Sequence, residues 1–141
     1  MRSLVCCLAL VLVVAPVVSA EKMTVDIKSA DGVMLKGSYY DAGQPGPAML
    51  LVHQCNMDRT SWESLASSLS GAGIHVLTFD LRGFGETPGE GLVSPESFPR
   101  LMKQSPPDVD AAYEYLLKQD GVDRSRVAVG AASCGVALTS D

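Results

Sequence analysis

A short apolar run that breaks into a turn of small residues constrains this chain most. Residues 126–129 are followed by Gly130, two alanines, Ser133, Cys134 and Gly135. A strand that turns through small residues into a helix can hold a serine at the tip of a sharp turn, with its hydroxyl clear of the backbone. The pattern is typical of a nucleophile elbow, and the alternative is an ordinary strand-to-helix turn of small residues.

The register of this turn favours Ser133 over Cys134 as the nucleophile. With Ser133 at the tip, the positions two residues away are Ala131 and Gly135, both small. With Cys134 at the tip, one of these positions is Val136, and a β-branched side chain fits a crowded turn poorly. No histidine follows Ser133 in the sequence, so we expect the chain to lack the base and the acid that complete a serine triad.

The first twenty residues have the pattern of a secretory signal peptide. Arg2 precedes an apolar stretch over residues 4–18, and small residues end at Ala20, where cleavage is expected. The alternative is an uncleaved membrane anchor, but the stretch is short for a bilayer span and Pro16 interrupts it. We therefore expect a secreted or periplasmic protein whose folded part is residues 21–141, with no membrane contact after cleavage.

Charge and cysteine content limit the function classes. The formal net charge is −5 and there is no basic run, which argues against nucleic acid or an anionic membrane as a partner. Cys55 and Cys134 lie outside the signal segment, and an exported protein can keep such a pair either oxidised or as free thiols. The sequence shows no cluster of metal ligands, and no cofactor is implied.

Periodicity predicts alternating strands and helices. Residues 23–28 and 33–39 alternate around a turn at Gly32 and predict a β-hairpin. The continuous apolar run 48–53 predicts a strand covered on both faces. A helix should follow from Thr60, which has capping-box spacing to Glu63. The remaining expected elements are a strand at 75–80, an irregular stretch over 81–107 with at most a short helix, a helix from Pro106 to Gly121, a strand at 126–130 and a helix from Ser133.

This order is typical of an α/β fold with a parallel sheet and crossover helices, led by an antiparallel hairpin. The carboxyl ends of parallel strands share one edge, so the loop at 53–59 should lie beside Ser133. Backbone N–H groups of this loop could join the N–H of Cys134 in binding an oxyanion. His53 in the same loop is either a general base or, as we favour, a buttress that hydrogen-bonds the loop. His75 begins a strand at the opposite end of the sheet and should be structural.

A second glycine-containing segment runs from Asp80 through Arg82 to Gly85. A dinucleotide-binding loop is disfavoured, because Pro88 stands where the third glycine belongs. We expect Asp80 and Arg82 to hold the turn by charge-assisted hydrogen bonds.

In order and spacing, these segments resemble the N-terminal part of the α/β-hydrolase superfamily, and are similar to its dienelactone-hydrolase-like and serine-aminopeptidase-like members. The resemblance covers residues 23–141, and its most specific motif is the Asp-x-Arg-Gly-x-Gly that starts at Asp80. It implies that Ser133 is the nucleophile and that the amides of Cys55 and Cys134 are the oxyanion donors. His53 and Arg82 would then be structural residues near the site.

Three features depart from the family pattern. Ala131 replaces the first glycine of Gly-x-Ser-x-Gly, Gln54 replaces the glycine after the loop histidine, and the family's catalytic acid and histidine lie on later strands. The resemblance implies a serine hydrolase acting on an ester, thioester or amide of a small molecule or peptide, truncated after the elbow, and the signal-peptide pattern adds that it is secreted or periplasmic. The alternatives are a non-catalytic, hydrolase-like binding domain and an inactive truncation product.

Overall fold

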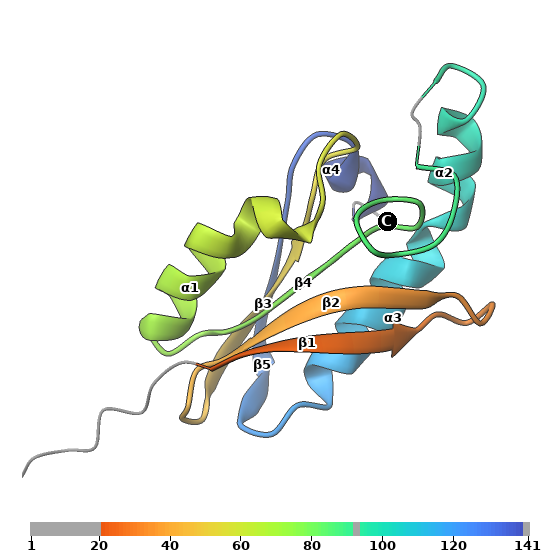
Figure 1. The fold of residues 1–141 in the computed structure, drawn as a ribbon. Coiled ribbons are helices and arrows are strands. Elements are labelled where there is room, and N and C mark those ends of the chain that lie inside the picture. The colour runs from red at the N-terminus through yellow and green to blue at the C-terminus, as the bar shows by residue number, and fades with distance from the viewer. Residues whose placement is uncertain (1–20, 92–93, 140–141) are drawn as a thin grey trace, which may run out of the picture.

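A five-stranded sheet runs through the computed structural model, which describes residues 21–91 and 94–139 (Figure 1). The predicted signal peptide lies outside the described residues. In chain order the elements are β1 (Glu21–Lys28), β2 (Met34–Asp41), β3 (Gly46–Val52), a 3-10 turn η1 (Arg59–Trp62), α1 (Glu63–Gly71), β4 (His75–Phe79), α2 (Phe98–Gln104), α3 (Pro106–Leu117), β5 (Val122–Ala131) and α4 (Cys134–Leu138).

The strand order is β1-β2-β4-β3-β5. β1 and β2 form an antiparallel hairpin, and β2 is also antiparallel to β4. β3 lies between β4 and β5 and is parallel to both. The predicted hairpin that leads into a parallel sheet is confirmed, and β5 is an edge strand of the described sheet.

The central strands are buried on both faces. Leu50 belongs to the core cluster that contains Ala112 of α3, whereas its neighbour Leu51 belongs to the cluster that contains Ala66 of α1. Successive side chains of a strand point to opposite faces, so a strand covered by helices on both sides needs consecutive apolar residues. Figure 1 shows this layering, with α1 on one side of the sheet and α3 on the other.

Two element boundaries differ from the sequence-based expectation. The predicted capping box of Thr60 and Glu63 is wrong, because Asp58 caps the preceding 3-10 turn and its carboxylate accepts from the N–H of Thr60 at 2.8 Å. β5 begins at Val122, which pairs with Gly46, and not at position 126. The early part of β5 is polar and therefore lacks the apolar pattern used to predict strands.

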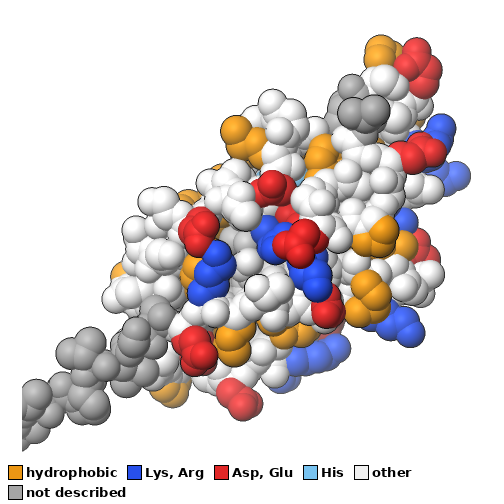
Figure 2. All heavy atoms as spheres, viewed as in Figure 1, with side chains coloured by type: hydrophobic (Ala, Val, Ile, Leu, Met, Phe, Trp, Pro, Cys, Tyr) orange, Lys and Arg blue, Asp and Glu red, His pale blue; other side chains and the backbone are white. Residues whose placement is uncertain are grey.

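Acidic and basic side chains are interspersed on the face seen in Figure 2, and no large patch of one sign covers it. Ion pairs account for part of this mixture, among them Lys22–Glu63 and Lys36–Asp26. In the described part of the chain, no helix combines the length and the apolarity that crossing a membrane requires.

Candidate active site

Ser133 occupies a strained turn between two regular elements. β5 ends at Ala131 and α4 begins at Cys134, so the chain must pass from the strand into the helix within Ala132 and Ser133. Ser133 is exposed and has φ 51° and ψ −119°, and it is the one non-glycine residue of the described chain with a positive φ. A non-glycine residue in such a conformation costs about 1–3 kcal/mol and persists only where its surroundings enforce it.

The end of β3 enforces this turn. The N–H of Ala132 donates to the carbonyl of Val52 at 3.2 Å, and the N–H of Val136 donates to the carbonyl of Ser133 at 3.0 Å. A Cβ atom added to Gly135 would lie 2.9 Å from the carbonyl oxygens of both Val52 and His53. Position 135 therefore has no room for a side chain.

Cys55 and Cys134 are joined by a disulfide, with their Cα atoms 5.9 Å apart. The predicted proximity of the two cysteines is confirmed, and the redox state that the sequence left open is the oxidised one. While the bond is intact, Cys134 has no thiolate to act as a nucleophile.

The backbone N–H groups of the two cysteines are unpaired. Among the described residues, neither the N–H of Cys55 nor that of Cys134 donates a hydrogen bond to any acceptor. Figure 1 shows the loop after β3 beside the start of α4, at the end of the sheet where Ser133 lies. Two free N–H donors next to a serine can stabilise the oxyanion of an acyl-transfer reaction.

Both ring nitrogens of His53 form hydrogen bonds with backbone groups. Its Nε2 accepts from the N–H of Leu81 at 3.0 Å, so Nδ1 carries the proton, which it donates to the carbonyl of Gln54 at 2.8 Å. The ring is completely buried, and burial lowers the pKa of His53 below its ordinary value. Both ring nitrogens are thus occupied by backbone groups, and the ring links the start of the loop to the segment after β4.

Asp80 lies at the end of β4 and is completely buried. Its carboxylate accepts from the N–H of Arg59 at 2.7 Å, from the guanidinium of Arg59, and from the N–H of Glu86 at 2.8 Å. Asp80 thus connects the segment after β4 to the first turn after the His53 loop. Sequence reasoning assigned no role to Arg59, and the signal that could have found it is the basic residue at the end of that loop.

Arg82 connects the segment after β4 to two further segments. Its guanidinium donates to both oxygens of Asp108 in α3, at 2.6 and 2.5 Å, and to Asp31 in the hairpin turn at 2.8 Å. These acceptors raise the pKa of Arg82. Asp80 and Arg82 therefore hold the turn by charge-assisted hydrogen bonds to partners on other elements, and not to each other.

His75 lies at the opposite end of the sheet. Its ring contacts the hydroxyl of Tyr39 at 2.7 Å and the carbonyl of Gln44 at 3.0 Å, and it is almost completely buried. These contacts leave it remote from Ser133, in a structural position.

A cavity of about 180 Å³ adjoins the Ser133 turn. It is lined by residues that follow β3 and by the residue before Ser133: Gln54, Met57, Ser61, Trp62 and Ala132. The indole N–H of Trp62 is buried and has no acceptor among the described residues. Polar and apolar side chains therefore both line the cavity, with Met57 and Trp62 as its large apolar residues.

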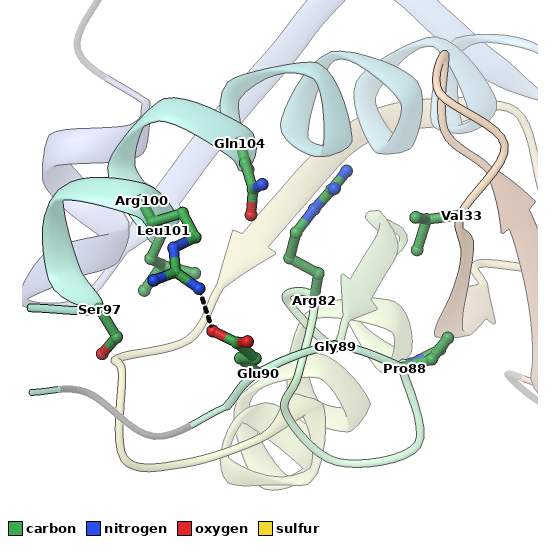
Figure 3. A pocket seen from close by; sticks show the side chains of 9 residues that line it. All are labelled: Val33, Arg82, Pro88, Gly89, Glu90, Ser97, Arg100, Leu101 and Gln104. Atoms are coloured by element: carbon green, nitrogen blue, oxygen red, sulfur yellow. Dashed lines mark hydrogen bonds and ion pairs between the residues drawn. The ribbon is translucent and has the colours of Figure 1, made fainter.

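A second cavity, of about 260 Å³, lies between the segment after β4 and α2 (Figure 3). Its wall includes Arg82, and an ion pair between Arg100 and Glu90 lies at its edge. None of its lining residues belongs to the Ser133 turn or to residues 53–58, so it is not part of the candidate site. Within the described ranges, no group of three or more His, Cys, Asp or Glu side chains could hold a metal ion.

The sequence matches no family model. It is 35% identical over 118 residues to the uncharacterized protein Rv2307c of Mycobacterium tuberculosis, covering 79% of this chain and 37% of that protein. It is 32% identical over 106 residues to the thiohydrolase apmlB of Arthrinium phaeospermum, covering 74% of this chain and 33% of that protein. The chain thus spans about a third of the length of these curated relatives.

Among solved structures, the chain is similar to the α/β hydrolase GrgF from Penicillium sp. sh18. The TM-score is 0.72 and the sequence identity is 23%, with 84% of this chain and 40% of GrgF covered. A likeness at this identity shows the arrangement of strands and helices.

Proposed function

The chain has the fold of the N-terminal portion of the α/β-hydrolase superfamily, and on that premise we propose that it carries the nucleophile and the oxyanion hole of a serine hydrolase. The observation that carries the proposal is that a serine and two unpaired backbone N–H groups lie together at one end of the sheet. An exposed, strained Ser133 lies between β5 and α4, and the unpaired N–H groups of Cys55 and Cys134 lie on the two segments that meet there. Strain of this kind is typical of a nucleophile elbow.

The mechanism follows from these positions. The hydroxyl oxygen of Ser133 attacks the substrate carbonyl carbon while a histidine base takes the hydroxyl proton. The carbonyl oxygen becomes an oxyanion that accepts from the N–H groups of Cys55 and Cys134. Collapse expels the leaving group and leaves an acyl-serine, which water then hydrolyses. In this proposal, the base and its orienting acid belong to later strands of the complete protein, outside residues 21–141.

The proposed substrates are esters, thioesters or amides of a small molecule or peptide. The thiohydrolase name of a relative that is 32% identical supports a thioester within this range. The cavity beside Ala132 supports a small apolar group next to the reacting carbonyl, because Met57 and Trp62 line it. No cofactor enters this mechanism.

We place the protein outside the cytoplasm. The disulfide between Cys55 and Cys134 supports this proposal, since disulfides persist in oxidising compartments. The signal-like pattern of residues 1–20 points the same way.

Residues 21–141 alone should not turn over substrate. The segment contains two histidines, and both His53 and His75 use their ring nitrogens in structural contacts. A serine nucleophile without its base loses several powers of ten in rate.

The test uses the protein from its complete reading frame, assayed on a p-nitrophenyl ester and on an acyl thioester. Ser133→Ala should lower kcat by roughly 10³-fold or more. Ser67→Ala, at an exposed serine of α1, is the matched control and should retain full turnover. Unchanged turnover in Ser133→Ala would refute the proposed function.

A further inference from the structure

We propose that the Cys55–Cys134 disulfide positions the two donors of the oxyanion hole, so that its reduction lowers the rate of acyl transfer. This inference rests on the proposed function, and it gives the disulfide a role in the reaction beyond holding the fold together. The donors are the backbone N–H groups of the same two residues whose side chains are joined.

The disulfide bridges two segments that the sheet no longer connects. Pairing between β3 and β5 ends at Val52 and Ala131, and one more hydrogen bond runs from Ala132 to Val52. Cys55 and Cys134 each lie three positions beyond these last paired residues. Among the described residues, no hydrogen bond or ion pair joins residues 54–58 to residues 133–136, and the disulfide is the one bond between these two segments.

The contacts within the loop do not replace that link. The N–H of Met57 donates to the carbonyl of Gln54 at 3.1 Å, and the amide of Gln54 donates to Asn56 at 2.5 Å. Both hydrogen bonds begin and end inside the loop. They shape the loop without contacting the Ser133 turn. His53 and Arg59 anchor the two ends of the loop to Leu81 and Asp80, so the disulfide is the bond that ties the middle of the loop to the Ser133 turn.

An oxyanion hole is sensitive to this distance. Its donors contribute only when both lie within hydrogen-bond reach of the position that the oxyanion takes in the transition state. The disulfide holds the two Cα atoms 5.9 Å apart, and each donor nitrogen is bonded to one of these atoms. Breaking the disulfide lets the two donors separate without removing either of them.

Both cysteines are half-buried, so a small dithiol can reach them. In the reduction, a thiolate of dithiothreitol attacks one cysteine sulfur and the S–S bond breaks. The second thiolate then closes the reagent to its cyclic disulfide. Two electrons and two protons pass from the dithiol to the protein, which gains the thiols of Cys55 and Cys134.

The experiment measures kcat and KM of the complete protein in oxidised form, after reduction by dithiothreitol, and after reoxidation. Three variants are measured in parallel: Cys55→Ser, Cys134→Ser and the double variant. We expect kcat to fall by the same factor, ~10- to 100-fold, in each variant and in the reduced wild type. This loss does not exceed the 10²- to 10³-fold loss of kcat caused by removing one oxyanion donor, because both donors are still present. KM should change little, reoxidation should restore the wild type, and dithiothreitol should not affect the double variant.

Three outcomes would overturn the proposal. In the first, every form without the disulfide keeps the wild-type kcat. In the second, the losses of kcat in Cys55→Ser and Cys134→Ser add up in the double variant, which would mean that the two cysteines act independently. The third concerns folding, which titration of Ser133 with an organophosphonate monitors. Fewer titratable sites with an unchanged kcat per site would show that the disulfide supports stability alone.

Ser133→Ala separates failure of this inference from failure of the proposed function. If Ser133→Ala is inactive and the disulfide-free forms are fully active, the hydrolase assignment stands and the positioning role is wrong. If Ser133→Ala keeps its turnover, the proposed function is wrong, and the positioning role of the disulfide, which depends on that function, is wrong as well.

Discussion

The carboxylate of Asp80 and the guanidinium of Arg59 form a buried ion pair that ties the end of β4 to the turn after the His53 loop. The Asp80 side chain is completely buried and that of Arg59 is 9% exposed. Arg59 also pairs with Glu86, so one guanidinium forms ion pairs with the buried carboxylate of Asp80 and the exposed carboxylate of Glu86. The pair fixes the segment that follows the proposed oxyanion loop.

Asp80→Asn is expected to lower the free energy of unfolding by about 3 kcal/mol, because it leaves the Arg59 charge without its buried partner. Urea denaturation of the complete protein measures the loss. Glu90→Gln is the matched control, since it breaks the exposed pair with Arg100 and should change stability little. Equal effects of the two substitutions would contradict a structural role for Asp80.

Gly135→Ala should destabilise the protein by roughly 1–3 kcal/mol, because overpacking forces the backbone of β3 or of α4 to move. The added methyl group would approach the carbonyls of Val52 and His53 at 2.9 Å. In Gly71→Ala a methyl group in α1 would meet nothing within 4 Å, so this control should be slightly stabilised, by up to about 1 kcal/mol. Thermal denaturation compares the two variants, and a tolerated alanine at position 135 would be inconsistent with the packing described.

Ser133→Gly should raise the free energy of unfolding by about 1 kcal/mol, because glycine adopts a positive φ without the steric cost that a Cβ brings. Ser133→Ala keeps the Cβ and should leave stability nearly unchanged. Both variants should be inactive. A stabilised but inactive glycine variant would show that the strain at Ser133 is retained for function, whereas a destabilised one would argue against strain at this position.

The stability of the protein should fall as the pH drops below about 6.5, the ordinary pKa of histidine. Burial lowers the pKa of His53 in the folded state, so the unfolded chain binds the proton first and the free energy of unfolding decreases toward acid. His53→Gln removes this titration and should flatten the profile between about pH 7.5 and pH 5.5. Parallel profiles for the wild type and the variant would mean that His53 does not contribute to the pH dependence.

Much of the fold could be predicted from local pattern. The alternation over β1 and β2, the apolar run of β3 and the proline that opens α3 each mark an element that the structure contains. The start of β5 was missed because Asp123, Arg124 and Ser125 lack the apolar pattern of a strand, although the pairing of Val122 with Gly46 carries the strand this far. Such pairing depends on the partner strand, which local pattern does not report.

The candidate site could also be predicted only in part, because local sequence pattern does not report tertiary contacts. The small residues around Ser133 indicated a sharp turn, but the positive φ and the closeness of Gly135 to β3 follow from tertiary packing. The partner of Asp80 lies 21 positions earlier in the chain, at Arg59, and no local motif connects the two. The sequence alone does not predict the disulfide, because the spacing of two cysteines does not determine whether their sulfurs meet.

Mass-spectrometric mapping of an organophosphonate adduct on the complete protein tests most directly whether Ser133 is the nucleophile. We expect the adduct on the peptide that contains Ser133, no labelling of Ser133→Ala, and continued labelling of Ser133 in Cys134→Ala. An adduct that persists in Ser133→Ala, or that disappears only when Cys134 is replaced, would contradict the account.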